Sequence, residues 1–283
     1  MKKTTYRQNL SARKRKKAKK SVRAQWLIGL SVIVLIGIVG YHYRSGLAYY
    51  LGYKIENMRH TEAEEKRLSD VRNFQILTKY KHKAAGIDVS EYQGEIVWDS
   101  LKDTETNFPI SFVFIRATVG KDRPDIKFAE NWEKAKQQNI LRGAYHYYRP
   151  NENSLEQASL FIRTVKLQKG DFPPVLDIEQ MPKKQPLDSL KIGLKRWLNK
   201  VEKHYGVKPI IYSGENFYNA VLKEEFDGYD FWIANYNFFA ENIQDEWQFW
   251  QFTEKGSVKG ITGPVDVNIF NGDPGSLRRL TIR

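Results

Sequence analysis

The fold is decided by residues 174–213, which read PVLDIEQMPKKQPLDSLKIGLKRWLNKVEKHYGVKPIIYS. A short apolar run, Pro174–Glu179, is followed by an amphipathic segment, Leu187–Tyr205, and then by a second apolar run, Pro209–Ser213. Short apolar runs on either side of a long helical pattern predict two parallel strands joined by a helix. This stretch therefore predicts one β-α-β unit.

The same rhythm extends to both sides of this unit. Further strands are predicted at Ala85–Ser90, Phe112–Thr118, Arg142–Tyr148, Phe231–Tyr236, Gln248–Phe252 and Pro264–Ile269. Further helices are predicted at Phe128–Gln138, Leu155–Leu167 and Glu215–Leu222. Eight strands in about 200 residues suit an α/β fold of the TIM-like β/α barrel type. The last three strands follow too closely for full helices between them, so we expect a modified barrel with irregular closing strands. An open doubly wound sheet is the alternative, although no Gly-x-Gly-x-x-Gly turn follows the first strand.

The positive charge of the chain is concentrated at its N-terminus. The first 24 residues hold 11 Lys or Arg and no acidic residue, whereas the whole chain holds 46 basic and 33 acidic residues, a net charge of +13. The remaining residues thus carry 35 basic and 33 acidic groups, a net charge of +2. This distribution describes a basic tail, residues 1–23, and argues against a nucleic-acid-binding fold.

Residues 24–43, AQWLIGLSVIVLIGIVGYHY, carry no charged side chain. As a helix they would span about 30 Å, the thickness of a hydrocarbon core, with Trp26 and Tyr43 near the two interfaces. The positive-inside rule keeps the basic tail cytoplasmic. We therefore expect a single-pass membrane protein whose remaining chain lies on the outer (periplasmic or extracellular) side. A cleaved signal peptide and a buried soluble helix are the alternatives.

Residues 44–83 are rich in charge and show a loose helical spacing from about Leu47 to Tyr80. They predict either a helical stalk or a segment laid against the following domain. The composition changes at Ala84, so four regions are expected: the tail 1–23, the transmembrane anchor 24–43, the stalk or linker 44–83, and a folded domain 84–283.

The residue types present limit the chemistry. The chain has no cysteine, which excludes disulfides, cysteine-ligated zinc and thiol nucleophiles. Aromatic residues make up 13% of the chain, either as a packed core or as a cleft in which rings stack on sugars.

Acidic side chains end several of the predicted strands, where a β/α barrel places its working groups. They are Asp88, Asp177, Glu179 and Asp266. Asp177 and Glu179 are two residues apart on one strand, so they face the same side. Burial and like charge raise the pKa of such a pair and leave a protonated acid beside an ionised partner, as glycoside hydrolysis requires. A salt-bridged strand end or a metal site is the alternative.

Seven motifs together resemble the family 25 glycoside hydrolases, the lysozymes of the Chalaropsis type. They run in order from Gly86 to Gly272: GIDVSEYQG, GAYHYYRP, PPVLDIE, IIYS, FWIANY, WQFT and PVDVNIF. The resemblance implies a modified β/α barrel with N-acetylmuramidase activity, which cleaves the β-1,4 bond between N-acetylmuramic acid and N-acetylglucosamine in peptidoglycan. It makes residues 84–283 the catalytic domain and requires no metal or cofactor.

The resemblance also implies roles for individual residues. Glu179 matches the general acid, and Asp177 matches the partner that tunes it or stabilises charge at the reacting sugar. Asp88 and Asp266 match the acidic residues of the first and last strands. Four aromatic residues match the lining of the sugar groove: Tyr147, Tyr212, Trp232 and Tyr236.

The N-terminal third departs from the family's usual secretion signal or wall-binding repeats and favours local wall remodelling. The sequence thus predicts a membrane-anchored peptidoglycan hydrolase whose partners are glycan strands and the membrane. The alternative is a non-catalytic membrane-anchored peptidoglycan-binding protein. The stereochemical outcome and the oligomeric state stay open at this stage.

Overall fold

The computed structural model describes residues 26–27, 30, 32–34, 62–104, 107–237, 240 and 242–283. The predicted tail 1–23, most of the predicted anchor 24–43 and the segment 44–61 lie outside the described residues. Within the described part of the chain, no helix is long and apolar enough to cross a membrane. The chain divides into two compact units, Met1–Thr61 and Glu62–Arg283, and the second holds the barrel.

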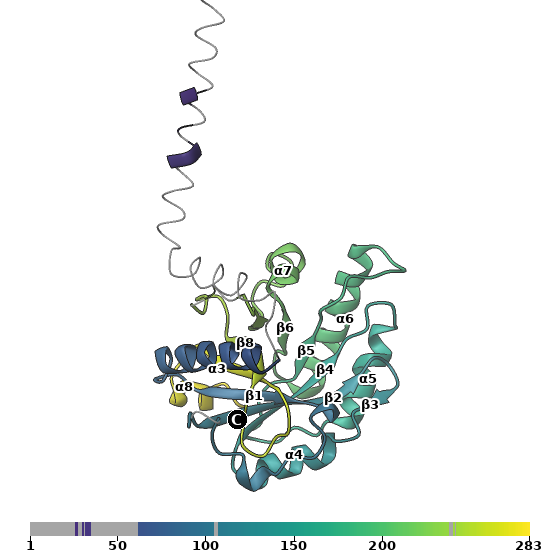
Figure 1. The fold of residues 1–283 in the computed structure, drawn as a ribbon. Helices are drawn as coiled ribbons and strands as arrows, with labels where there is room; N and C mark the ends of the chain where they lie inside the picture. Colours follow the sequence, from purple (N-terminus) through teal and green to yellow (C-terminus); the bar gives the residue numbers. More distant parts are fainter. Residues whose placement is uncertain are drawn as a thin grey trace, which may run out of the picture. The chain divides into compact units, whose positions relative to one another are not determined.

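Eight strands close into a barrel, with a ninth short strand attached at the edge (Figure 1). The strands are β1 (Ala85–Val89), β2 (Ile110–Val119), β3 (Arg123–Pro124), β4 (Leu141–Tyr147), β5 (Val175–Asp177), β6 (Ile210–Gly214), β7 (Phe231–Ala234), β8 (Phe249–Gly256) and β9 (Val265–Phe270). Their order is β1-β9-β8-β7-β6-β5-β4-β2, with β3 on the far side of β2, and the pairing of β1 with β2 closes the ring. The predicted α/β barrel is confirmed, and the open sheet is excluded.

The closing strands are irregular, as predicted. Strand β9 runs antiparallel to both β1 and β8, whereas the other neighbours in the ring are parallel. The β8–β9 ladder shifts register twice, after Gln251 and after Thr253. Among the described residues between β7 and β9 there is no helix. Because β9 is reversed, its first residues meet the carboxyl ends of the parallel strands.

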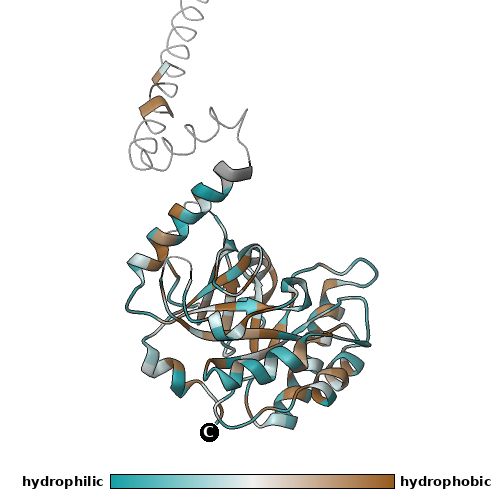
Figure 2. Ribbon diagram, turned by 60° about the horizontal axis from the view of Figure 1, so that its bottom comes forward, coloured by the Kyte–Doolittle hydropathy of each residue, from teal (hydrophilic) through white to brown (hydrophobic). Residues whose placement is uncertain are grey.

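The helices are α3 (Glu62–Lys79), α4 (Phe128–Gln137), α5 (Ser154–Thr164), α6 (Leu187–Tyr205), α7 (Glu215–Phe217) and α8 (Pro274–Arg279). Helix α7 continues as a π-helical turn, Tyr218–Leu222, and short 3₁₀ turns form at Glu91–Gln93 and Trp98–Ser100. The bounds of α6 match the prediction because its amphipathic pattern ends at Gly206, whose φ of 72° forms a left-handed cap. In Figure 2 several helices carry both hydrophobic and hydrophilic segments, as expected for helices that cover a barrel.

Two apolar clusters hold the unit together. One lies between the strands and the helices and includes Leu176, Ile178 and Trp197. The other consists largely of aromatic rings inside the barrel: Phe112, Phe114, Phe172, Trp232, Phe249 and Phe270. Two glycines make room for these rings, because a Cβ on Gly86 or Gly143 would lie 2.5 Å from Phe112 or Phe114 respectively. The rings fill the barrel interior beneath its carboxyl end.

Helix α3 falls within the predicted stalk, and the structure packs it against the barrel. Ile76 and Leu77 are buried in the larger core. The Arg72 guanidinium donates through Nη1 to the carbonyl oxygen of Phe252 at 2.7 Å. The Tyr80 ring meets the Trp250 ring edge-on at 6.3 Å between centroids. The compact unit thus begins at Glu62 rather than at Ala84, and residues 62–83 are the segment laid against the domain.

Candidate active site

A pocket of about 260 Å³ opens at the carboxyl end of the barrel strands. All eight side chains singled out in the sequence line it: Asp88, Tyr147, Asp177, Glu179, Tyr212, Trp232, Tyr236 and Asp266. Eight further residues, to which the sequence assigned no role, also line it: Val89, Ser90, Tyr92, Gln93, Arg116, Tyr145, Gln251 and Glu254. The predicted residues therefore converge, within a larger polar set.

Asp177 and Glu179 enter the pocket side by side, although the strand is shorter than predicted. Strand β5 ends at Asp177, so Glu179 lies two residues beyond it rather than on it. The chain still follows β6, because the amide of Ile178 donates to the carbonyl oxygen of Tyr212 at 3.0 Å and the Ser213 hydroxyl donates to that of Ile178 at 2.6 Å. The alternation of faces therefore continues past the strand, and Ile178 is buried on the helix side.

The two carboxyl groups differ in access. Asp177 is 4% exposed, and its Oδ1 has no hydrogen-bond partner among the described residues, whereas Glu179 is exposed at the opening. Burial raises the pKa of Asp177 well above its usual range, and the neighbouring charges of Glu179 and Asp88 raise it further. Burial also raises the pKa of Glu179, against a hydrogen bond from Tyr212 that lowers it. Because the pKa values of both Asp177 and Glu179 are raised, the two groups together bind a proton more readily than free carboxyl groups do.

Asp88 and Asp266 stand directly opposite each other in the antiparallel pair of β1 and β9. Burial raises the pKa of Asp88 to about 6, although hydrogen bonds from Asn268 and Gln251 oppose the rise. Burial, followed by the negative charge of Asp88, raises the pKa of Asp266 to about 9. Near neutral pH this second pair therefore favours sharing one proton, and Asp88 is the more readily ionised of the two groups.

A family model for glycosyl hydrolases of family 25 matches residues 87–261, which is more than half of the chain. The chain belongs to glycosyl hydrolase family 25. The matched range contains Asp88, Asp177 and Glu179 and ends before Asp266. Membership makes the protein a glycosidase and confirms the resemblance seen in the sequence.

Relatives and solved structures agree with this family. The chain is 37% identical over 252 residues to the uncharacterized protein YegX of Escherichia coli O6:H1, which covers 88% of this chain and 92% of the relative. It is 33% identical over 211 residues to lysozyme M1 of Streptomyces globisporus, covering 69% of this chain and 70% of the relative. A solved family 25 glycosyl hydrolase from Bacillus anthracis matches with a TM-score of 0.62 at 30% identity, covering 71% of this chain and 94% of that one.

The aromatic residues of this family 25 pocket divide into a floor and a rim. Trp232 is 1% exposed, stacks on Phe114 with 4.5 Å between centroids, and forms part of the floor. Tyr212 is buried beside it. Tyr236 is 42% exposed, and Tyr147 accepts a hydrogen bond from Gln180 at 2.9 Å. Tyr147 and Tyr236 are thus the rings with open faces, whereas Trp232 mainly shapes the floor.

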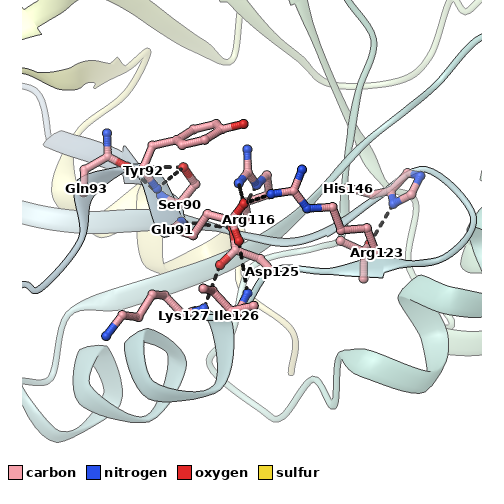
Figure 3. A network of polar contacts seen from close by, with 11 residues as sticks. Ser90, Glu91, Tyr92, Gln93, Arg116, Arg123, Asp125, Ile126, Lys127 and His146 are labelled. Atoms are coloured by element: carbon pink, nitrogen blue, oxygen red, sulfur yellow. Dashed lines mark hydrogen bonds and ion pairs between the residues drawn. The ribbon is translucent and has the colours of Figure 1, made fainter.

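Arg116 brings a positive charge to the acidic pocket. Figure 3 shows it in a network of polar contacts with Glu91 and Asp125. Its Nε donates to Asp125 Oδ2 at 2.9 Å, its Nη2 lies 3.1 Å from Glu91 Oε1, and its guanidinium lies 4.6 Å from the centre of the Tyr92 ring. Its charge lowers the pKa of Asp177, against the effects of burial and the neighbouring carboxylates. Its place near the end of an apolar strand marks Arg116 in the sequence, but its role does not follow from it, because its partners Glu91 and Asp125 lie in other segments of the chain.

Ser90 begins the 3₁₀ turn that carries Glu91 and Tyr92. Its hydroxyl accepts from the Tyr92 amide, and Gln93 Oε1 accepts from the Ser90 amide at 2.8 Å, which completes a capping box. This Ser-x-x-Gln spacing is a readable sequence signal that could have located the turn. In the described part of the chain, no group of three or more His, Asp or Glu side chains is arranged to hold a metal ion.

Proposed function

We propose that the protein is a membrane-anchored N-acetylmuramidase that cleaves the β-1,4 bond between N-acetylmuramic acid and N-acetylglucosamine in peptidoglycan. The observation that carries the proposal is the convergence of four carboxyl groups, two of them buried, in one pocket of a family 25 barrel. The names of two similar proteins, lysozyme M1 of Streptomyces globisporus and a bacterial lysozyme of Streptomyces coelicolor, support the choice of substrate.

Glu179 is the proposed general acid, because it is the member of its pair that a substrate can reach. Its raised pKa keeps a proton available for the glycosidic oxygen. As that proton transfers, the bond from the anomeric carbon to the oxygen breaks and the electron pair leaves with the oxygen. Water supplies the hydroxyl group that completes hydrolysis at the anomeric carbon, and its proton returns to a carboxylate of the pocket.

Negative charge near the anomeric carbon stabilises the positive charge that develops there. Asp88 is the ionised member of its pair and provides this charge, while Asp177 lines the same pocket as a buried carboxyl group whose own pKa is raised by burial and by the charge of Glu179. The open rings of Tyr147 and Tyr236 offer faces on which sugar rings stack.

The membrane anchor is supported by the uncharged stretch 24–43 and the basic residues that precede it. The described positions within that stretch are helical, and the apolar side chains of Trp26, Leu27 and Leu30 are exposed. We place the basic tail in the cytoplasm and residues 62–283 on the outer side of the membrane. There the enzyme would act on the nearby wall.

Glu179→Gln tests the assignment of the acid. The variant keeps the size of the side chain but has no proton of suitable acidity, so we expect reducing-end release from purified peptidoglycan to fall about 100- to 10,000-fold. The exposed Glu133→Gln on α4 is the matched control and should keep full activity. Near-normal release by Glu179→Gln would show that another group is the acid.

Product analysis tests the bond. Borohydride reduction of the products, followed by mass spectrometry, should place N-acetylmuramic acid at the new reducing ends. N-acetylglucosamine at those ends would contradict the proposed cleavage. Binding of the wild type to peptidoglycan without release of fragments would instead identify a non-catalytic binding protein.

A further inference from the structure

Two buried amides surround Asp88, and the sequence had singled out neither for a role in the site. Gln251 Nε2 donates to Asp88 Oδ2 at 2.7 Å, and Asn268 Nδ2 donates to the same oxygen at 2.8 Å. Gln251 is 2% exposed and Asn268 is fully buried. They come from β8 and β9, more than 160 residues along the chain from β1. One carboxylate oxygen thus receives two N–H donors from different strands.

The orientation of each amide is fixed by its other partners. Trp232 Nε1, which is only a donor, lies 2.7 Å from Asn268 Oδ1, so Asn268 must turn its NH₂ group toward Asp88. The hydroxyl groups of Tyr212 and Tyr236, which can donate or accept, lie against Gln251 Oε1, the former at 2.7 Å, and the NH₂ group of Gln251 faces the Asp88 carboxylate. A flipped amide would set oxygen against oxygen. The network therefore accepts Asp88 only as a hydrogen-bond acceptor.

Asp266 shows what Asp88 would be without these amides. The two carboxyl groups are paired across β1 and β9, and burial is the largest cause of the raised pKa of both. Asp88 receives two amide hydrogen bonds that favour its charged form, and its pKa stays at about 6. No such amide acts on Asp266, whose pKa reaches about 9. The positions of Gln251 and Asn268 therefore contribute to the asymmetry of the pair, together with the hydrogen bond between the two carboxyl groups and the charge of Glu254 on Asp266.

Other titratable groups also face Asp88 across the pocket, from each strand that surrounds it. They are Arg116 on β2, Tyr145 on β4, Asp177 and Glu179 at β5, Tyr212 on β6, Tyr236 after β7, Glu254 on β8 and Asp266 on β9. Most are acidic or phenolic, so their combined effect opposes ionisation of Asp88. Among the side chains that hydrogen-bond to Asp88, the two amides are the ones that cannot titrate.

We infer that Gln251 and Asn268 are positioning residues that hold Asp88 ionised and in one orientation, and so decide which carboxyl of the Asp88–Asp266 pair faces the reacting sugar as an anion. This inference rests on the proposed function for its role in catalysis. Gln251 also connects Asp88 to the side of the pocket that holds the acid, because its partner Tyr212 lines the pocket together with Glu179. The charge-stabilising and proton-donating ends of the pocket thus share one amide.

Asn268→Asp and Gln251→Glu test the inference with side chains of nearly unchanged size. Each replaces an N–H donor to Asp88 with a second carboxyl group, which competes for a proton. The measurement is an NMR titration of the full-length protein in detergent, with ¹³C at the aspartate carboxyl carbons. We expect the titration midpoint of the Asp88 carboxyl group to rise by about one pH unit or more in each variant. The apparent pKa of the acidic limb in the profile of kcat against pH should rise by the same amount, and KM should change less than about threefold.

The matched control is Asn131→Asp. Asn131 is also a buried amide that accepts from a tryptophan, Trp98 Nε1 at 3.3 Å, but it lies on α4 and does not line the pocket. We expect this variant to lose thermal stability with no movement of the Asp88 midpoint. If Asn268→Asp or Gln251→Glu does not fold, Gln251→Met removes the hydrogen bond from Gln251 to Asp88 at similar volume and should also raise the midpoint.

An Asp88 midpoint and pH profile that stay unmoved in folded variants would overturn the inference and leave the amides with a packing role alone. The titration needs no substrate, so it decides the inference even if the wild type releases nothing from peptidoglycan. That last result would overturn the proposed function, whereas an unmoved midpoint in an active enzyme would overturn only the positioning role.

Discussion

Strand β4 has a buried ion pair at its beginning and the acidic pocket at its end. At the beginning, Arg142 Nε lies 2.7 Å from Asp171 Oδ1, and the guanidinium lies 4.0 Å from the centre of the Trp132 ring. Asp171 also accepts the Gln168 amide at 2.7 Å. At the end, Tyr147 pairs in register with Asp177, and four carboxyl groups share the pocket with one arginine, Arg116.

The difference separates charge used for structure from charge used for chemistry. Where Arg142 meets Asp171, opposite charges compensate each other and hydrogen bonds satisfy both. In the pocket, like charges are buried together, which raises the pKa of all four carboxyl groups and makes protons available near neutral pH. Such an arrangement lowers stability, so removing one of its charges should affect activity far more than folding.

The largest expected effect is that of Asp177→Asn. Loss of this carboxyl removes one of the two neighbouring groups that can hold a proton at the reacting bond, so we expect kcat to fall about 100-fold or more. The free energy of unfolding should stay level or rise, because a buried carboxyl without a partner for Oδ1 is replaced by an uncharged group. Reducing-end release and thermal unfolding measure the two quantities. A clear loss of stability would mean that Asp177 is structural, like Asp171.

Arg142→Met should show the opposite pattern. Removing the cation leaves Asp171 buried without its partner, which costs about 3–5 kcal/mol of unfolding free energy. Activity per folded molecule should stay unchanged. Urea denaturation measures the loss, and the double variant with Asp171→Leu should recover part of it, since the unpaired charge is gone. A large fall in kcat at full folding would show that the two ends of the barrel are coupled.

The smallest effect concerns the pH dependence of stability. The raised pKa values of Asp88 and Asp266 mean that the folded state binds more protons than the unfolded state between about pH 4 and 9. Stability should therefore fall as the pH rises through this range. Buried His146, whose pKa is lowered to about 3, acts in the opposite direction only below about pH 6.5.

Between pH 7 and 9 the titration of His146 therefore does not contribute to the pH dependence of stability. There we expect the wild type to lose on the order of 1 kcal/mol, or about 2–4 °C in Tm, and Asp266→Asn to flatten the slope. Thermal unfolding at several pH values measures it. An equal slope in the variant would mean that Asp266 does not hold the proton.

Periodicity and residue type allowed much of the barrel to be predicted. The eight barrel strands and helix α6 were found because burial on one face leaves a pattern in the chain. Strand β5 was predicted too long, because an apolar run continues past the last ladder bond at Asp177. Helix α8 was missed, although Asp273 before Pro274 is a readable helix start. Two-residue strand β3 leaves no pattern to read.

The carboxylates of the pocket could be predicted, whereas their polar partners could not. Asp88, Asp177, Glu179 and Asp266 are conspicuous because charge is rare at the ends of apolar strands. Gln251 and Asn268 look like ordinary strand residues, and their role depends on which side chain the closed barrel brings opposite them. That pairing is a property of register across strands distant in sequence, which local pattern does not encode.

The packing of α3 against the barrel also sets the length of the linker between the proposed membrane anchor and the folded unit. With residues 24–43 in the membrane, as proposed, a free linker from 44 to 83 would extend about 140 Å at most. Because residues from Glu62 onward belong to the folded unit, only 44–61 remain as tether, and these extend about 60 Å at most. The tether would then limit how far the barrel can move from the membrane. The glycan layers nearest the lipid would lie within its reach, and layers farther out would escape cleavage because the barrel cannot reach them.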